Sequence, residues 1–141
     1  MTLYELTHQY KPLEVVGRTD VEISGIELDS RKCKPGTAFV AIRGTQADGH
    51  TYIEKAISLG AGCIICEHLP ENPNPDVTYA VYGNTAEIVG PLATTFYGNP
   101  TKRMKLVGIT RTNAKTTIAT TLYNINRRIG IQADLCSTVC N

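Results

Sequence analysis

One stretch of this sequence combines the residue types that bind phosphate groups. It runs from Gly108 to Thr117 and reads Gly-Ile-Thr-Arg-Thr-Asn-Ala-Lys-Thr-Thr. An apolar segment, a tight loop, a Lys-Thr pair and a helical segment in this order are typical of a phosphate-binding loop. Backbone N–H groups and the helix N-terminus would surround the phosphates, Lys115 would neutralise their charge, and the hydroxyl of Thr116 would reach Mg²⁺.

Two residues depart from this pattern. Arg111 and Ala114 stand where such a loop normally has glycine. Glycine allows positive φ and lets the backbone approach a phosphate without a Cβ. The spacing therefore leaves two interpretations equally open: an altered phosphate-binding loop, or an ordinary strand-to-helix turn with Asn113 as the N-cap.

The cysteines suggest a second kind of chemistry, because Cys63 and Cys66 have the CxxC spacing of metal and redox sites. They lie in an apolar run of strand length, however, and on a strand residues i and i+3 point to opposite faces. We expect buried, reduced side chains here rather than a zinc or redox site. The odd number of cysteines does not indicate a disulfide framework; they are Cys33, Cys63, Cys66, Cys136 and Cys140.

The composition is that of an ordinary globular protein. The 141 residues are 42% hydrophobic and 19% charged, and 14 Lys and Arg against 13 Asp and Glu give a net charge of +1. This balance argues against disorder and provides no basic surface for nucleic acid or membranes. No apolar run approaches the roughly 18–20 residues of a membrane span, and the first residues lack a signal-peptide pattern. We therefore expect a cytoplasmic protein with no nucleic-acid or membrane partner.

Helical and strand patterns alternate along the first part of the chain. Helices are predicted over residues 3–10, 52–59 and 86–96, and strands over residues 21–28, 38–42, 63–66 and 77–82. Three prolines predict an exposed loop over residues 70–76. This order predicts an α/β fold with helices packed on a mostly parallel sheet.

A change of composition at residues 97–103 predicts a boundary between a domain over 1–98 and a second domain over 99–141. The second part is predicted to contain a strand over 104–110, a helix over 115–129 and a strand that begins at 131–135. This order predicts a β-α-β that is too short to close a core of its own, and it is the first β-α-β of a P-loop ATPase-type domain if the segment over 108–117 is a phosphate-binding loop. Uncovered apolar surface there would favour association, although the sequence does not indicate an oligomeric state.

Several segments, in one order, resemble the Mur ligase family. Thr112, Asn113, Lys115, Thr116 and Thr117 match the family's loop Gly-Thr-Asn-Gly-Lys-Thr-Thr, whereas Arg111 and Ala114 do not. Further matches are Leu28–Arg31, Pro35-Gly36, Phe39–Ala41, Gly44–His50, Gly60-Ala61 and Ser137–Val139. The resemblance covers essentially the whole chain, but only the front part of a full Mur ligase.

The resemblance implies a cytoplasmic, ATP-dependent, amide-forming ligase of peptidoglycan synthesis that uses ATP and Mg²⁺. The segment over residues 45–50 is most similar to members that add the third residue to UDP-N-acetylmuramoyl-L-alanyl-D-glutamate. In those members the N-terminal domain binds the uridine diphosphate end of this precursor. The γ-phosphoryl group of ATP passes to the D-glutamate carboxylate, and an amine attacks the resulting acyl phosphate.

The resemblance also implies roles for individual residues. Leu28 and Ser30 would contact uridine, and Thr45, Gln46 and Ala47 would form the adjoining wall of that site. The loop that holds the ATP phosphates would comprise Arg111, Thr112, Asn113, Ala114, Lys115, Thr116 and Thr117, with Thr116 on Mg²⁺. The resemblance places no catalytic residue within this chain.

Each candidate has a simpler structural interpretation. Ser30 is also suited to a turn, and Leu28 is also suited to the core. Asp29 and Arg31 could form a local ion pair. The segment Asp48-Gly49-His50 is expected to shape its loop. His50 is a poor candidate for a general base, because the sequence supplies no evident carboxylate to orient it. His8 and His68 are expected on the surface.

Three functions remain open. The chain is part of a third-residue Mur ligase that binds the UDP precursor but uses ATP poorly, because Arg111 and Ala114 replace glycine. Alternatively, it is a non-catalytic UDP-sugar-binding module with a decayed phosphate loop, or a generic P-loop nucleotide binder.

Overall fold

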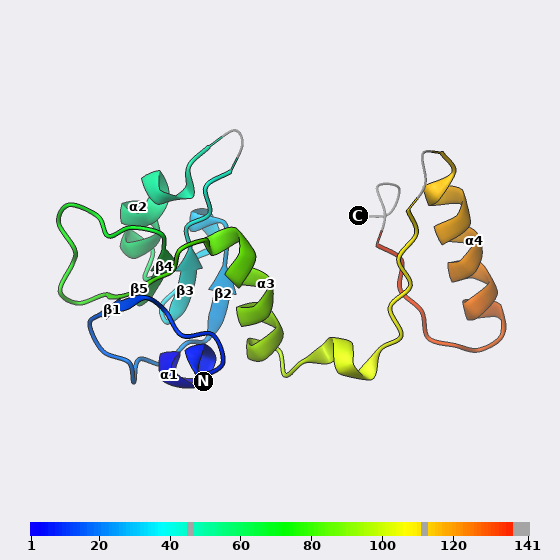
Figure 1. Ribbon diagram of the computed structural model, residues 1–141, viewed down its shortest axis with the longest axis horizontal. Helices are drawn as coiled ribbons and strands as arrows, with labels where there is room; N and C mark the ends of the chain where they lie inside the picture. Colours follow the sequence, from blue (N-terminus) through cyan, green and yellow to red (C-terminus); the bar gives the residue numbers. More distant parts are fainter. Residues whose placement is uncertain (45–46, 111–112, 137–141) are drawn as a thin grey trace. The chain divides into compact units, whose positions relative to one another are not determined.

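The computed structural model of this chain describes residues 1–44, 47–110 and 113–136 (Figure 1). It divides into two compact units, residues 1–103 and 104–141, and each unit is described by itself.

The first unit is built on a five-stranded sheet with the order β1-β5-β4-β3-β2. Strands β2 to β5 are parallel, and β1 pairs antiparallel with β5. The strands are β1 Glu14–Val16, β2 Gly25–Glu27, β3 Thr37–Val40, β4 Cys63–Cys66 and β5 Thr78–Val81. The predicted α/β class with a mostly parallel sheet is confirmed.

Helices cover both faces of this sheet. As a consequence, β3, β4 and β5 are buried along their whole length. Phe39, Ile64 and Tyr79 point to one face, where they pack with residues of α2; Val40 and Ile65 point to the other, where they pack with residues of α1 and α3. The helices are α1 Leu3–Thr7, α2 Ile53–Ser58 and α3 Thr85–Phe96, and the 3₁₀ turns are η1 Ser30–Lys32, η2 Gly49–Tyr52 and η3 Pro100–Arg103.

The CxxC cysteines lie on opposite faces of β4, as predicted. Cys66 packs in the cluster on the α2 side and Cys63 in the cluster on the α1 and α3 side. Burial raises the pKa of the Cys63 thiol to about 12 and that of Cys66 to about 11. Within the described residues no group of three His, Cys, Asp or Glu side chains could hold a metal ion.

Native alkylation is expected to spare these two thiols. The thiolate is the reactive form, and with a pKa of about 11 or 12 only about one thiol in a thousand or fewer is ionised at pH 8. The exposed Cys136 is therefore expected to react with iodoacetamide long before Cys63 and Cys66, and urea is expected to make all of them reactive. Peptide mass spectrometry over time checks this; equal native rates at Cys63 and Cys136 would contradict the buried assignment.

Some element predictions were wrong at their ends. The strand predicted over 21–28 is reduced to β2, because Val21 and Ile23 instead bond to the N-terminal segment: the Leu3 N–H donates to the Val21 carbonyl at 3.0 Å, and the Ile23 N–H donates to the Met1 carbonyl at 2.7 Å. The first helix ends at Thr7 rather than Tyr10. Strand β1 was not predicted, because it is three residues long and only partly buried.

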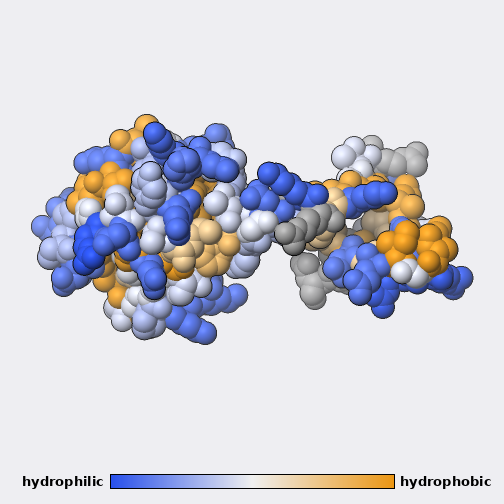
Figure 2. Space-filling model, turned by 90° about the horizontal axis from the view of Figure 1, so that it is seen from below, coloured by the Kyte–Doolittle hydropathy of each residue, from blue (hydrophilic) through white to orange (hydrophobic). Residues whose placement is uncertain are grey.

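The second unit contains one of its three predicted elements. Helix α4, Lys115–Arg128, ends one residue before the predicted end. The strands predicted over 104–110 and from 131 were wrong: the described residues there form no ladder, and Leu106 and Val107 are 72% and 74% exposed. None of the unit's described residues is buried, and Figure 2 shows apolar side chains gathered on its surface.

Candidate functional site

Several polar residues of the first unit follow the carboxyl ends of the parallel strands. Ser30 comes after β2, the segment that ends in His50 comes after β3, Glu67 comes directly after β4, and Thr85 comes after β5. In open α/β sheets this edge is where ligands bind, because successive loops meet there. The edge therefore defines the candidate site of the first unit.

At the end of β2 the side chain of Asp29 organises a tight turn. It accepts hydrogen bonds from the backbone N–H of Arg31 at 3.0 Å and from the Arg31 guanidinium at 2.8–3.2 Å. These bonds from Arg31 lower the pKa of the Asp29 carboxyl to about 2. The local ion pair is thus present. Leu28 is 56% exposed, which excludes it from the core, and Ser30 is 6% exposed at the start of η1.

Removing the Arg31 side chain is expected to raise the pKa of Asp29 toward its ordinary value. Its pKa is lowered from 3.8 to about 2 in the folded chain, so the stabilisation is present above about pH 3.8 and is lost as the pH falls toward 2. The Arg31→Ala variant is expected to return the Asp29 pKa toward 3.8, as read from carboxyl carbon NMR shifts. Arg18→Ala, which removes the partner of Asp20, is the control and should leave Asp29 unchanged; a shift of Asp29 in that variant would contradict the local pairing.

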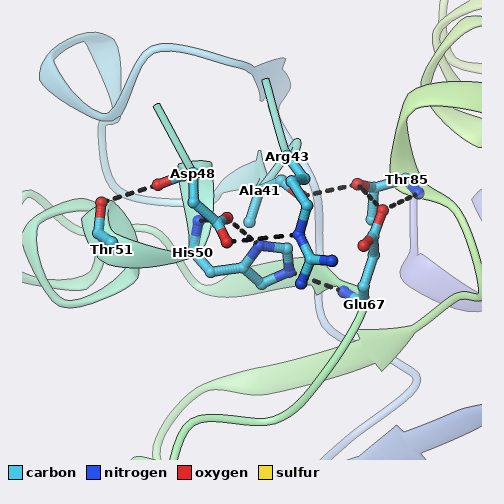
Figure 3. Close-up of polar contacts among 7 residues, drawn as sticks. All are labelled: Ala41, Arg43, Asp48, His50, Thr51, Glu67 and Thr85. Carbon is cyan, nitrogen blue, oxygen red and sulfur yellow. Dashed lines mark hydrogen bonds and ion pairs between the residues drawn. The ribbon is translucent and has the colours of Figure 1, made fainter. Parts of the chain in front are cut away.

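Three consecutive residues, Asp48, Gly49 and His50, shape the segment after β3. Figure 3 shows the side chains of Asp48 and His50. Asp48 Oδ1 accepts from the backbone N–H of His50 at 3.0 Å and lies 2.6 Å from Nδ1 of the same residue. Gly49 lies so close to Ile42 that a Cβ would come within 2.7 Å of the Ile42 backbone N and O atoms. Two hydrogen bonds from His50 lower the pKa of the Asp48 carboxyl. The bond from the backbone N–H has the larger effect and the bond from the ring the smaller.

The ring of His50 reaches across to β4, and β4 in turn is tied to α3. The backbone N–H of Glu67 donates to His50 Nε2 at 2.9 Å. Glu67 Oε1 accepts from the backbone N–H of Thr85 at 3.1 Å, which is the main cause of the lowered pKa of Glu67. The fully buried hydroxyl of Thr85 donates to the Ala41 carbonyl at 2.7 Å. One network thus connects the ends of β3 and β4 with the first turn of α3 (Figure 3).

This network corrects one statement made from the sequence. His50 does have an orienting carboxylate, Asp48, and its position two residues upstream was the available signal. Both ring nitrogens are engaged and the side chain is 6% exposed, so the ring holds the loop rather than transfers protons. His68 and His8 are exposed as expected, and the His68 ring stacks on that of His50 at 4.2 Å.

In the second unit the residue before α4 has an unusual backbone. Ala114 is the N-cap, with φ 62° and ψ 16°, and its side chain provides no capping hydrogen bond. The interpretation with Asn113 as the cap was wrong. The left-handed conformation is the one that favours glycine. Asn113, Lys115 and Thr117 are exposed and Thr116 is half-buried; Thr45, Gln46, Arg111 and Thr112 lie outside the described residues.

A hollow of the described surface lies elsewhere. A cavity of about 520 Å³ opens between α2 and the loop predicted over 70–76, where its polar lining includes Glu54, Glu71 and Asn72. It contains none of the predicted site residues. Of these, Leu28, Ser30 and Ala47 follow the adjacent strands β2 and β3, whereas the phosphate-loop residues belong to the second unit.

Comparison with known families agrees with this arrangement. Residues 22–97 match the model of the Mur ligase family, catalytic domain. The chain belongs to the Mur ligase family. The matched segment runs from before β2 to the end of α3, so it contains the strand ends described above.

Curated members of the family are similar over most or all of this chain. The chain is 56% identical over 128 residues, 91% of its length, to UDP-N-acetylmuramoyl-L-alanyl-D-glutamate--2,6-diaminopimelate ligase of Phocaeicola vulgatus. It is 50% identical over its whole length to the protein of the same name from Bacteroides thetaiotaomicron. The matched regions are 26% and 29% of these relatives, so the chain spans just over a quarter of their length.

Solved Mur ligase structures share the fold. A crystal structure of MurF from Acinetobacter baumannii matches with a TM-score of 0.70 and 22% identity, over 91% of this chain and 28% of that one. MurF ligase from Thermotoga maritima, solved in complex with ADP, matches with a TM-score of 0.57 and 27% identity over 77% of this chain and 24% of that one. Among the residues that the structure describes, no helix is long and apolar enough to cross a membrane.

Proposed function

We propose that this chain supplies the uridine-nucleotide site of a cytoplasmic ligase that adds the third residue to UDP-N-acetylmuramoyl-L-alanyl-D-glutamate in peptidoglycan synthesis. The observation that carries the proposal is identity of 50% along the whole chain to a relative with that substrate in its name. The exposed Leu28 and Ala47, in the segments that follow the adjacent strands β2 and β3, support a ligand site at this edge.

In this proposal the first unit binds and orients the precursor. Leu28 and Ser30 contact the uridine, and the segment of Thr45, Gln46 and Ala47 forms the neighbouring wall. A parallel sheet places these groups on rigid supports, because β3 is buried along its length, and rigid supports favour accurate positioning of a ligand.

The second unit has features of a phosphate site, but Arg111 and Ala114 stand where the family's loop has glycine. The N-terminus of a helix favours anions, and α4 begins with Lys115 and Thr116, which would hold the phosphates of ATP and Mg²⁺ respectively. When bound, ATP supplies the phosphoryl group that activates the D-glutamate carboxylate toward an amine. Ala114 has the left-handed backbone that favours glycine, so its backbone fits such a loop, but it carries a Cβ.

Titration with UDP tests the first part of the proposal. Isothermal titration is expected to show binding of UDP by the chain, and Ser30→Ala is expected to weaken it about 10-fold through one lost hydrogen bond. Ser58→Ala is the matched control, because Ser58 is on α2 and its hydroxyl bonds only locally, to the Lys55 carbonyl at 2.7 Å. Absence of UDP binding, or equal loss in both variants, would contradict the assigned site.

A second candidate is supported by Ala114. A residue with a Cβ in the left-handed conformation at a phosphate loop is what a non-catalytic UDP-sugar-binding module with a decayed phosphate site would contain. Binding of the precursor without binding of Mg-ATP is common to an impaired ligase and to such a module. Binding of ATP alone would instead support a generic nucleotide binder.

A further inference from the structure

The two nitrogens of His50 make bonds of different kinds. Nδ1 lies 2.6 Å from Oδ1 of Asp48, two residues away on the same loop. Nε2 accepts the backbone N–H of Glu67 at 2.9 Å, 17 residues further along the chain. The first bond is internal to the loop, whereas the second joins the loop to the end of β4.

Other bonds give the loop its shape without attaching it to β4. The Gly44 N–H donates to the Ala47 carbonyl at 3.0 Å, and the Gly49 N–H donates to the Ile42 carbonyl at 2.8 Å. Arg43 Nε lies 3.5 Å from Oδ2 of Asp48. The bond from Gly49 attaches the end of the loop to Ile42, just after β3, so His50 provides the separate attachment to the neighbouring strand, β4.

The hydrogen bonds also define the protonation of the ring. A backbone N–H is always a donor, so Nε2 of His50 must be the unprotonated nitrogen, and Nδ1 carries the proton that is donated to Asp48. The side chain is 6% exposed, so little water is available to replace the bond from Glu67. Glu67 is itself held by the backbone N–H of Thr85 at 3.1 Å, which continues the link into α3.

We propose that His50 is a positioning residue of the nucleotide site: through its Nε2 bond to Glu67 it fixes the loop that presents Ala47 at the end of β3. The inference rests on the proposed uridine site, since it assigns the support of one residue of that site, Ala47. His50 does not touch the nucleotide in this proposal; it acts through the loop.

Two substitutions separate the two bonds. In His50→Gln the amide oxygen stands near the place of Nε2 and keeps an acceptor for Glu67, whereas in His50→Asn the amide nitrogen stands near Nδ1 and keeps only the bond to Asp48. Amide hydrogen exchange at Gly44 and Gly49, whose N–H groups donate within the loop, is expected to stay within about 3-fold of wild type in His50→Gln. It is expected to be about 10-fold faster in His50→Asn, with exchange in β3 and β4 unchanged. UDP affinity is expected to follow, near wild type in His50→Gln and about 10-fold weaker in His50→Asn.

The control is His68→Gln, which removes the stacked ring but neither of these bonds, and it should change exchange and affinity little. An equal loss of amide protection and UDP affinity in His50→Gln and His50→Asn would overturn the proposal. The packing of the ring, and not its bond to Glu67, would then support the loop. UDP binding by His50→Asn at wild-type strength would overturn this inference alone. A wild-type chain that does not bind UDP would overturn it together with the proposed function, which distinguishes the two failures.

Discussion

Replacement of both Arg111 and Ala114 by glycine is expected to strengthen the binding of Mg-ATP by this chain about 100-fold to 10,000-fold. The estimate assumes that the two departures from the family's loop cost two backbone hydrogen bonds to a charged phosphate, about 3–6 kcal/mol in total, at about 1.4 kcal/mol for each factor of ten. Isothermal titration of the wild type and the double variant measures the difference directly.

The backbone of Ala114 supports this expectation. Its φ of 62° is one that costs a residue with a Cβ about 1–2 kcal/mol and glycine almost nothing. Glycine also loosens the unfolded chain, which offsets part of that gain. The double variant is therefore expected to change nucleotide affinity much more than it changes the stability of the chain.

Asn99 provides the matched control for this substitution. Among the described residues other than glycine, only Asn99 and Ala114 have positive φ, and φ of Asn99 is 56°. Asn99 belongs to the first unit and is not part of the phosphate-loop segment. Asn99→Gly relieves a similar backbone conformation and should leave Mg-ATP affinity unchanged. Equal binding of Mg-ATP by the wild type and the double variant would show that the loop tolerates Arg111 and Ala114, as it would if Arg111 contacted phosphate itself.

The features predicted well from the sequence were those fixed by local periodicity. The alternation of a strand places Cys63 and Cys66 on opposite faces whatever the sheet contains, and α4 follows from its own sequence. The strands over 104–110 and from 131 failed for the opposite reason, because an apolar pattern forms a strand only where a neighbour accepts its hydrogen bonds.

The contacts of the candidate site that were missed are mostly non-local. The bond from Glu67 to His50 joins residues 17 apart, and that from Thr85 to Ala41 joins residues 44 apart. Neither partner could be read from the sequence, because a backbone N–H or carbonyl is present at almost every position and only the sheet register selects one. The Asp48 partner of His50 was readable, since an Asp side chain commonly bonds to groups two residues on.

Leu92→Ala is expected to reduce the free energy of unfolding of the first unit by about 2–5 kcal/mol, the usual cost of truncating a fully buried leucine. Leu92 is 0% exposed and packs with Leu3 and Leu6 of α1 on the α1 and α3 side of the sheet. Urea unfolding followed by circular dichroism measures the change. Leu13→Ala is the control, because Leu13 is 77% exposed and should cost less than about 0.5 kcal/mol.

Helix α3 gives a reason to expect the upper part of that range. Pro91 lies inside the helix and lacks a backbone N–H, so one bond of the helical ladder cannot form and the helix depends more on its packing. The same helix begins at Thr85, whose backbone N–H donates to Glu67 Oε1, so loosening α3 is expected also to speed amide exchange at Thr85. Equal unfolding free energies for Leu92→Ala and Leu13→Ala would contradict the packing of α3 on this sheet, and with it the support proposed for the nucleotide site.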